Sequence, residues 1–257
     1  MAIIIGLAFA VLVVVLLAAF VVPEIRRVRR LEDVVVEEIP DQACAFGYKM
    51  AWLAIRTEDT QKLVRSLKLA RTMPANWNSG IGTVYDDKLG PSHVYVTPPV
   101  DGWTFVVGLA LPHPVNERFV DKLTPLLLSL GDEFNEVQYF FTYPLIDFFA
   151  WARVQNRRLT RAFAVNDEGI VWNKGRITRA EKALGMSLFE LRGVRERHGD
   201  AGGELVLYPT EEHVMQIARS WSIDPIKLDQ MEAGAGVGFL APIPASWSPE
   251  RRRKAAA

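Results

Sequence analysis

The residues of this chain that could bind a metal or act in catalysis are few and widely spaced. The four histidines are His93, His113, His198 and His213, and Cys44 is the single cysteine. Structural zinc sites take Cys and His ligands in local pairs, about two to five residues apart. The sequence has no such pair, so the spacing predicts no metal site, and we expect no cofactor.

Sequence motifs for a covalent nucleophile or for nucleotide phosphates are also missing. No Gly-x-Ser-x-Gly pattern occurs, and Cys44 has no local signature of a catalytic thiol. Residues 234–238 read Gly-Ala-Gly-Val-Gly, but neither a helical pattern nor the acidic residue of a dinucleotide-binding motif follows them. We interpret this segment as a flexible or tightly turned connector.

Clustered carboxylates are the remaining candidates for acid-base or metal chemistry. Each cluster lies at an expected turn or helix end, where the helix dipole or a turn hydrogen bond accounts for an acidic residue. The clusters are Asp86-Asp87, Asp132-Glu133-Glu136, Asp167-Glu168 and Glu211-Glu212. Asp86 and Asp87 are similar to the acids of metal-dependent hydrolases, so such an enzyme remains an alternative.

Aromatic and arginine residues indicate binding more than catalysis. Trp77 falls in an expected loop, and Trp103 lies where an expected loop meets the expected strand 103–111. Arg153, Arg158 and Arg161 lie among apolar residues in an expected strand meander. One interpretation is a large aromatic core beneath the helices. The other is a face for a protein partner, with the two tryptophans as anchors and the arginines around them.

The elements that must position these side chains predict an α+β domain. Expected strands cover residues 48–55, 93–97, 103–111 and 137–143, and expected helices cover residues 57–69 and 117–130. Their order along the chain is the ferredoxin-like βαββαβ order. Residues 146–172 predict an added antiparallel meander, and a different α+β sandwich is the alternative. Residues 178–181, Thr-Arg-Ala-Glu, have the capping-box pattern that begins a helix.

The first residues of the chain predict a membrane anchor. From Ala2 to Val22 the sequence has no charged or strongly polar residue. A helix of this length rises about 31 Å, and the hydrocarbon core of a bilayer is about 30 Å thick. A cleaved secretory signal would have basic residues before a shorter apolar core. The run therefore predicts one transmembrane helix that holds the chain in a lipid bilayer.

Basic residues after this run predict its orientation. Arg26, Arg27, Arg29 and Arg30 follow it, and no Lys or Arg precedes it. Positive charges beside a span stay on the cytoplasmic side. The predicted location is the cell membrane, as a single-pass protein with its N-terminus outside and its soluble domain in the cytoplasm.

The charge balance argues against a nucleic-acid-binding role. The chain has 30 Lys and Arg residues and 30 Asp and Glu residues, so it has no overall basic field. The predicted parts are a transmembrane helix at residues 1–23, a juxtamembrane connector at 24–45, an α+β domain at 46–245 and a basic tail at 246–257.

Together these features favour a membrane-anchored cytoplasmic domain that binds a protein partner without evident catalysis. An adaptor, a regulator and an immunity-like protein would each fit this description. The alternatives are an enzyme with an unrecognised site, such as a hydrolase that uses Asp86 and Asp87, and a sensor of lipid surfaces through its basic segments.

Overall fold

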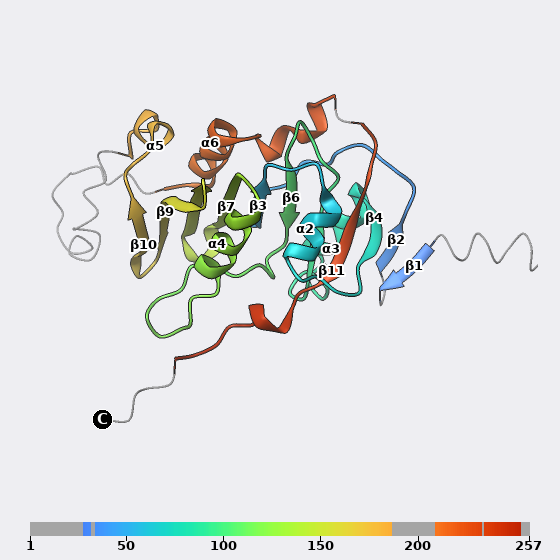
Figure 1. Cartoon of the computed structure of the whole chain (residues 1–257), viewed down its shortest axis with the longest axis horizontal. Coiled ribbons are helices and arrows are strands. Elements are labelled where there is room, and N and C mark those ends of the chain that lie inside the picture. Colours follow the sequence, from blue (N-terminus) through green and yellow to red (C-terminus); the bar gives the residue numbers. More distant parts are fainter. Residues whose placement is uncertain (1–27, 32–33, 187–208, 233, 253–257) are drawn as a thin grey trace, which may run out of the picture.

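A large antiparallel sheet forms the centre of the molecule. The computed structural model describes residues 28–31, 34–186, 209–232 and 234–252, with side chains from Val36 onward. Nine strands pair in the order β10-β9-β8-β7-β3-β6-β5-β11-β4, each antiparallel to its neighbours (Figure 1). These strands are β3 (Ala51–Ile55), β4 (Met73–Asn76), β5 (His93–Val96), β6 (Thr104–Val107), β7 (Glu136–Tyr143), β8 (Phe148–Gln155), β9 (Arg158–Asn166), β10 (Gly169–Gly175) and β11 (Val237–Pro242).

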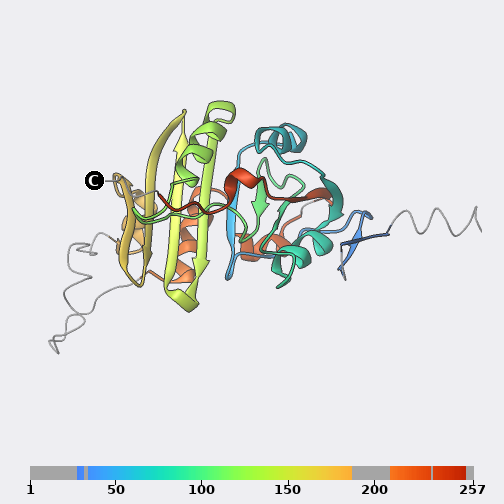
Figure 2. The same cartoon turned by 90° about the horizontal axis from the view of Figure 1, so that it is seen from below.

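Helices cover both faces of this sheet. α2 (Thr60–Ser66) and α4 (Leu123–Glu133) pack on one face, and α3 (Trp77–Tyr85), α5 (Arg179–Ala183) and α6 (Glu211–Trp221) pack on the other (Figure 2). The short 3-10 helices are η1 (Pro144–Ile146), η3 (Pro225–Gln230) and η4 (Ala245–Trp247). Beyond the sheet, β1 (Val28–Leu31) and β2 (Val34–Glu37) form a separate antiparallel hairpin.

Strand β3 shows why the sheet needs two helical layers. All five of its residues are fully buried. Trp52 and Ala54 belong to the core beneath α6, whereas Ala51, Leu53 and Ile55 belong to the core beneath α2 and α4. Successive side chains of a strand point to opposite faces, so a strand that is apolar throughout requires cover on both sides.

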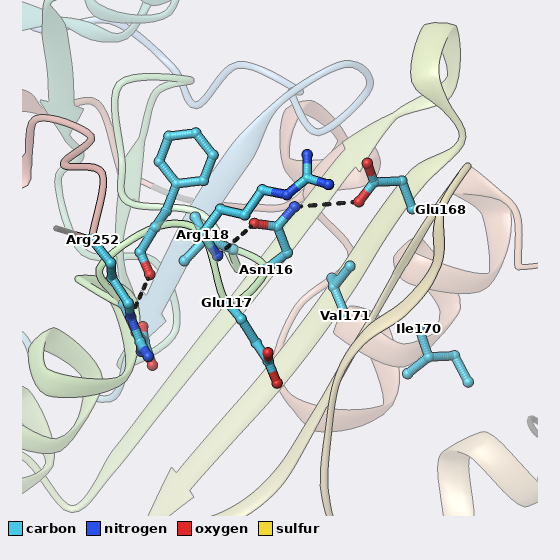
Figure 3. A pocket seen from close by; sticks show the side chains of 10 residues that line it. Asn116, Glu117, Arg118, Glu168, Ile170, Val171 and Arg252 are labelled. Atoms are coloured by element: carbon cyan, nitrogen blue, oxygen red, sulfur yellow. Dashed lines mark hydrogen bonds between the residues drawn. The ribbon is translucent and has the colours of Figure 1, made fainter. Parts of the chain in front are cut away.

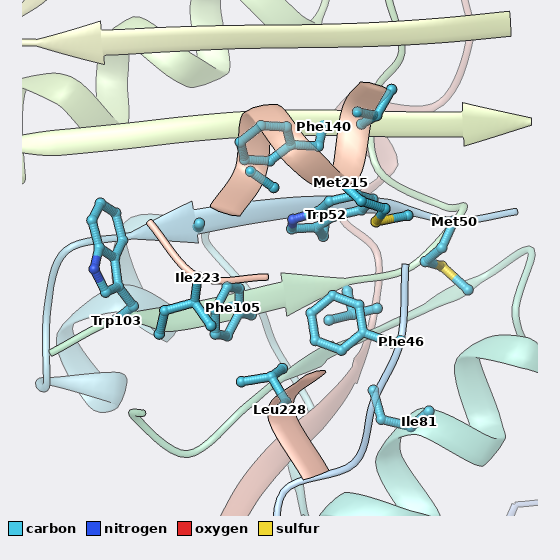
Figure 4. Packing of buried hydrophobic residues seen from close by; sticks show 14 of the residues in the cluster. Phe46, Met50, Trp52, Ile81, Trp103, Phe105, Phe140, Met215, Ile223 and Leu228 are labelled. Atoms are coloured by element: carbon cyan, nitrogen blue, oxygen red, sulfur yellow. The ribbon is translucent and has the colours of Figure 1, made fainter. Parts of the chain in front are cut away.

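The core beneath α6 is rich in aromatic side chains. Trp52 stacks on Phe140 with ring centroids 5.1 Å apart, and Figure 4 shows Met215 of α6 beside the same indole. Phe46 meets Trp52 edge to face at 6.0 Å. Large rings bury much apolar area for few side chains, which stabilises this layer over a wide sheet.

The predicted ferredoxin-like fold class is wrong. The sheet has nine strands rather than the few of that fold, and helices flank both of its faces. Part of the error comes from residues 74–90, which the sequence patterns predict to be irregular, whereas residues 73–85 form β4 and α3. The rest comes from β11, which lies between β5 and β4 and begins within residues 234–238, the segment interpreted as a connector.

The predicted transmembrane helix also requires correction. In the part of the chain that the structure describes, no helix is long and apolar enough to cross a bilayer. Residues 2–22, on which the prediction was based, lie outside the described residues, as do Arg26 and Arg27. Arg29 and Arg30 lie in strand β1. The structure therefore gives no support to the predicted single-pass topology or cell-membrane location.

Candidate functional site

One edge of the sheet is closed by the chain itself. Strand β4 has only four residues, one of which is Pro74. The Asn76 side-chain amide donates to the Ile39 carbonyl at 3.0 Å, which holds residues 36–41 beside the strand. Asp41 accepts hydrogen bonds from the backbone N–H of Trp77 at 2.6 Å and of Asn78 at 3.0 Å, which fixes the same segment to the start of α3. Residues 36–41 therefore cover this edge of the sheet.

The opposite edge is built from the longer strand β10. Its seven residues pair with β9, and among the described residues no other strand pairs with it. Ile170, Val171 and Trp172 in its centre are half-buried, and a register shift between Ile170 and Trp172 marks a bulge. Backbone groups on an unpaired edge are ready to pair with another chain. This edge is therefore the first candidate for an interaction surface.

A groove of about 490 Å³ lies beside the start of β10 (Figure 3). It lies between the loop 115–121, the turn from β9 to β10 and the C-terminal segment. Its charged lining comprises three carboxylates and two guanidinium groups: Glu117, Asp121, Glu168, Arg118 and Arg252. The Asn116 amide donates to the Glu168 carboxylate at 3.3 Å across the groove. The groove thus offers polar and charged groups next to the outer side of β10, with which no described strand pairs.

The C-terminal segment supports the loop that borders this groove. The Val120 N–H donates to the Glu250 carbonyl at 2.8 Å, and the Arg252 N–H donates to the Arg118 carbonyl at 2.9 Å. An ion pair of 2.7 Å joins Lys122 to the Glu250 carboxylate. The two backbone hydrogen bonds flank an antiparallel bridge between Phe119 and Arg251. The loop is therefore held by a segment that lies more than a hundred residues away in the sequence.

Beneath the same loop lies a second, more apolar cavity of about 280 Å³, which His113 lines. Burial lowers the pKa of His113 to about 4, so its imidazole is neutral at pH 7. Nε2 lies 2.8 Å from the Leu109 carbonyl and therefore carries the proton, which leaves Nδ1 to accept from the Tyr139 hydroxyl at 3.1 Å. Both ring nitrogens are thus engaged, and the ring packs on Phe141 with centroids 4.5 Å apart. The contacts give His113 a packing role.

Two of the predicted contact arginines, Arg153 and Arg158, lie in different surroundings: Arg153 is half-buried and Arg158 is exposed. Arg153 pairs with Glu136 at 2.7 Å, and its guanidinium lies 5.4 Å from the ring centroid of Trp221. Gln138 donates to the same Glu136 carboxylate and to the Trp221 carbonyl. This network joins α6 to the sheet. Arg158 is exposed at the start of β9, opposite Gln155 in the hairpin register.

The third arginine, Arg161, forms a buried ion pair. It meets Glu181 of α5 at 2.7 Å, and the two side chains are 5% and 1% exposed. The Trp151 indole N–H donates to the same carboxylate at 3.0 Å. Arg161 also donates to the Asn173 side chain at 2.8 Å and to the Lys174 carbonyl at 3.0 Å, both in β10. Arg161 is therefore the internal support of the open edge.

The predicted aromatic anchors lie in the core. Trp77 is fully buried and meets Tyr95 edge to face at 6.0 Å. Trp103 is 6% exposed, and the Arg56 guanidinium lies 5.8 Å from its ring centroid. A binding anchor must present its ring to the partner, and neither indole does so in this conformation. Partner binding itself stays a prediction, and it has to use other residues.

The acidic pair proposed for a hydrolase serves a turn. Asp86 accepts hydrogen bonds from the backbone N–H of Lys88 and of Leu89, each at 2.9 Å, and these bonds lower the pKa of its carboxyl. Asp87 is exposed. Across the described ranges, no group of three or more His, Cys, Asp or Glu side chains is arranged to hold a metal ion. No specific geometry in these residues favours the hydrolase.

Sequence reasoning did not single out the groove or the β10 edge. Loop residues 115–121 have no motif, and only the pairing of strands identifies the edge of a sheet. One signal was visible in the sequence. Acidic Asp167 and Glu168 precede β10, basic Lys174 lies near its end, and basic Arg176 follows it. Comparison with protein-family models, curated proteins and solved structures found no match for this chain.

Proposed function

We propose that this chain is a protein-interaction domain that binds an extended segment of a partner along β10. The observation that carries the proposal is the seven-residue strand β10, whose outer side pairs with no strand among the described residues, together with the groove at its start. An adaptor, a regulator or an immunity-like protein would each use such a surface. The proposal concerns binding and assigns no reaction.

The backbone of β10 supports this mode of binding. In β-strand addition, main-chain hydrogen bonds to the edge supply affinity, and pockets for alternate side chains supply specificity. The edge offers the main-chain groups, and Ile170 and Val171 line the groove at the same time. A partner strand on β10 would therefore direct side chains towards the groove.

The support of the edge from inside agrees with a binding role. Arg161 holds β10 through Asn173 and Lys174, and Glu181 holds Arg161. A strand that is fixed before binding loses less conformational entropy when a partner pairs with it. Rigid support therefore favours affinity at this edge.

Site-specific cross-linking in cells tests the proposal. A photoreactive amino acid replaces Ile170 in the full chain, and a matched one replaces Leu128, which is 38% exposed on α4. We expect a cross-linked product from position 170 and none from position 128, with the partner identified by mass spectrometry.

Binding to the purified partner is then measured for the full chain and two variants. We expect Ile170→Asp to weaken binding by about tenfold or more, because a charge replaces an apolar contact at the groove. Leu128→Asp serves as the control and should change the affinity less than about twofold. Equal affinities of Ile170→Asp and the unmodified chain would show that the partner binds elsewhere.

A further inference from the structure

We infer that the partner at the β10 edge is a second copy of this chain, whose own β10 adds antiparallel to the first. This inference rests on the proposed function, because it names the occupant of the same surface. The two nine-stranded sheets would then continue into each other across a two-fold axis. In such an isologous interface, each residue that contacts another is itself contacted in the same way by the second copy.

The distribution of charge along β10 supports self-pairing. Asp167 and Glu168 at its start are exposed, and so are Lys174 and Arg176 at its end. When two identical strands pair antiparallel, the start of each lies beside the end of the other. The acidic end of one copy thus meets the basic end of the other twice in the interface. Opposite charges across a strand pair stabilise it, and like charges destabilise it.

The groove adds to the same complementarity. It lies at the acidic end of β10, where Glu117, Asp121 and Glu168 provide three carboxylates against the guanidinium groups of Arg118 and Arg252. An antiparallel second copy brings its Lys174 and Arg176 to this end. A guanidinium group forms paired, charge-assisted hydrogen bonds with carboxylates. We therefore expect the Arg176 side chain of the second copy to occupy the groove.

Between the charged ends, the centre of β10 is apolar. Ile170, Val171 and Trp172 are half-buried, so each retains surface that a neighbouring strand can cover. Interfaces that form stable dimers commonly have an apolar centre and a polar rim. β10 has the same arrangement, an apolar centre between two charged ends, and both copies would present it to each other.

Charge reversal in two differently tagged full chains tests the inference. The acid-end variant carries Asp167→Lys and Glu168→Lys, and the base-end variant carries Lys174→Glu and Arg176→Glu. All four positions are exposed, so the fold should tolerate the changes. A control variant carries Glu58→Lys and Arg65→Glu, which reverse exposed charges in or beside α2. Co-purification of one tag with the other is the measurement.

The expected pattern is specific to antiparallel self-pairing. Two unmodified chains co-purify, and so do two control chains. Two acid-end chains, or two base-end chains, should bind each other about tenfold more weakly, which corresponds to a loss of about 1.4 kcal/mol in binding free energy, and less of one tag should co-purify with the other. An acid-end chain mixed with a base-end chain should recover the original level, because opposite charges again face each other at both ends.

Three results would overturn the inference. Unmodified chains that fail to co-purify would exclude a stable dimer. Acid-end or base-end pairs that co-purify as well as the unmodified chain would indicate association through another surface. A mixed pair that fails to recover would exclude antiparallel pairing of β10. In each case, weaker partner binding by Ile170→Asp would still support the proposed function with a different occupant.

Discussion

The two edges of the sheet differ in how the chain treats their unpaired backbone. At β4 the strand is short and contains Pro74, and residues 36–41 lie alongside it. At β10 the strand is longer, and no described residue pairs with its outer side. Natural sheets usually protect edges with short strands, proline or a covering segment. β4 uses all three, and this makes the open edge of β10 the exception to be explained by function.

The support of the two edges also differs. β4 is held by its cover from outside, through Asn76 and Asp41. β10 is held from inside, through Arg161 and the helix α5 that carries Glu181. Support from inside leaves the outer side of β10 accessible.

Loss of Arg161 should damage the open edge most. Arg161→Met leaves Glu181 as a buried carboxylate without its cation, and breaking such a pair costs about 3–5 kcal/mol. Denaturant unfolding measures the free energy of unfolding, and hydrogen exchange should show the largest loss of protection in β10. Arg161→Met combined with Glu181→Gln removes the orphaned charge and should recover most of the stability. A single variant within about 1 kcal/mol of the unmodified chain would contradict internal support by this pair.

Mild acid should lower the free energy of unfolding through His113, which lies beneath the loop beside the open edge. Its pKa is about 4 in the fold and 6.5 when unperturbed, so the unfolded chain binds this proton first as the pH falls. The stabilisation is therefore complete above pH 6.5 and is lost as the pH falls towards 4, at up to about 1.4 kcal/mol per pH unit.

The measurement is the free energy of unfolding at several pH values for the unmodified chain and for His113→Gln. Glutamine can keep both hydrogen bonds but does not titrate, so it serves as the control. The difference between the two curves isolates His113 from the carboxyl groups. Parallel curves between pH 6.5 and 4 would contradict a buried neutral imidazole.

Removal of the cover at β4 should have the smallest effect of the three. Asp41→Ala loses three hydrogen bonds at the start of α3, and we expect a cost of about 1–2 kcal/mol. Asp59→Ala is the control, since Asp59 accepts one hydrogen bond from Lys62 N–H at the start of α2. Hydrogen exchange of the β4 amides should become faster in Asp41→Ala alone. Unchanged exchange would mean that residues 36–41 stay in place without Asp41.

Local patterns in the sequence located many of the elements. The strand expected at residues 137–143 is β7 (Glu136–Tyr143), and the capping box at Thr178 and Glu181 is confirmed at the start of α5. Helix α4 starts at Leu123 rather than near residue 117, because Pro125 is tolerated only in the first turn of a helix. Residues 74–90 were predicted to be irregular because two glycines in this segment weaken its helical propensity. Asn76 nevertheless caps the start of α3 there.

The candidate site was less predictable than the elements. The same Glu181 that caps α5 also receives Arg161 and Trp151, and no local pattern indicates that second role. Trp77 was expected in a loop and Trp103 at the end of one, but tertiary packing buries both. Residues 234–238 were interpreted as a connector, yet Val237 and Gly238 begin strand β11 (Val237–Pro242), which lies between β5 and β4. Gly238 permits this, because a Cβ there would collide with the Val96 carbonyl of β5.

The sequence by itself determined the apolar strands, several helix starts and the charge polarity of β10, because these depend on neighbours within a few residues. Only the tertiary structure decided which strands became edges, which arginines were buried and where the groove formed. Strand pairing joins residues far apart in the chain, as when β11 meets β4 across more than a hundred and fifty residues. Such pairings depend on the mutual fit of whole surfaces, which no short stretch of sequence contains.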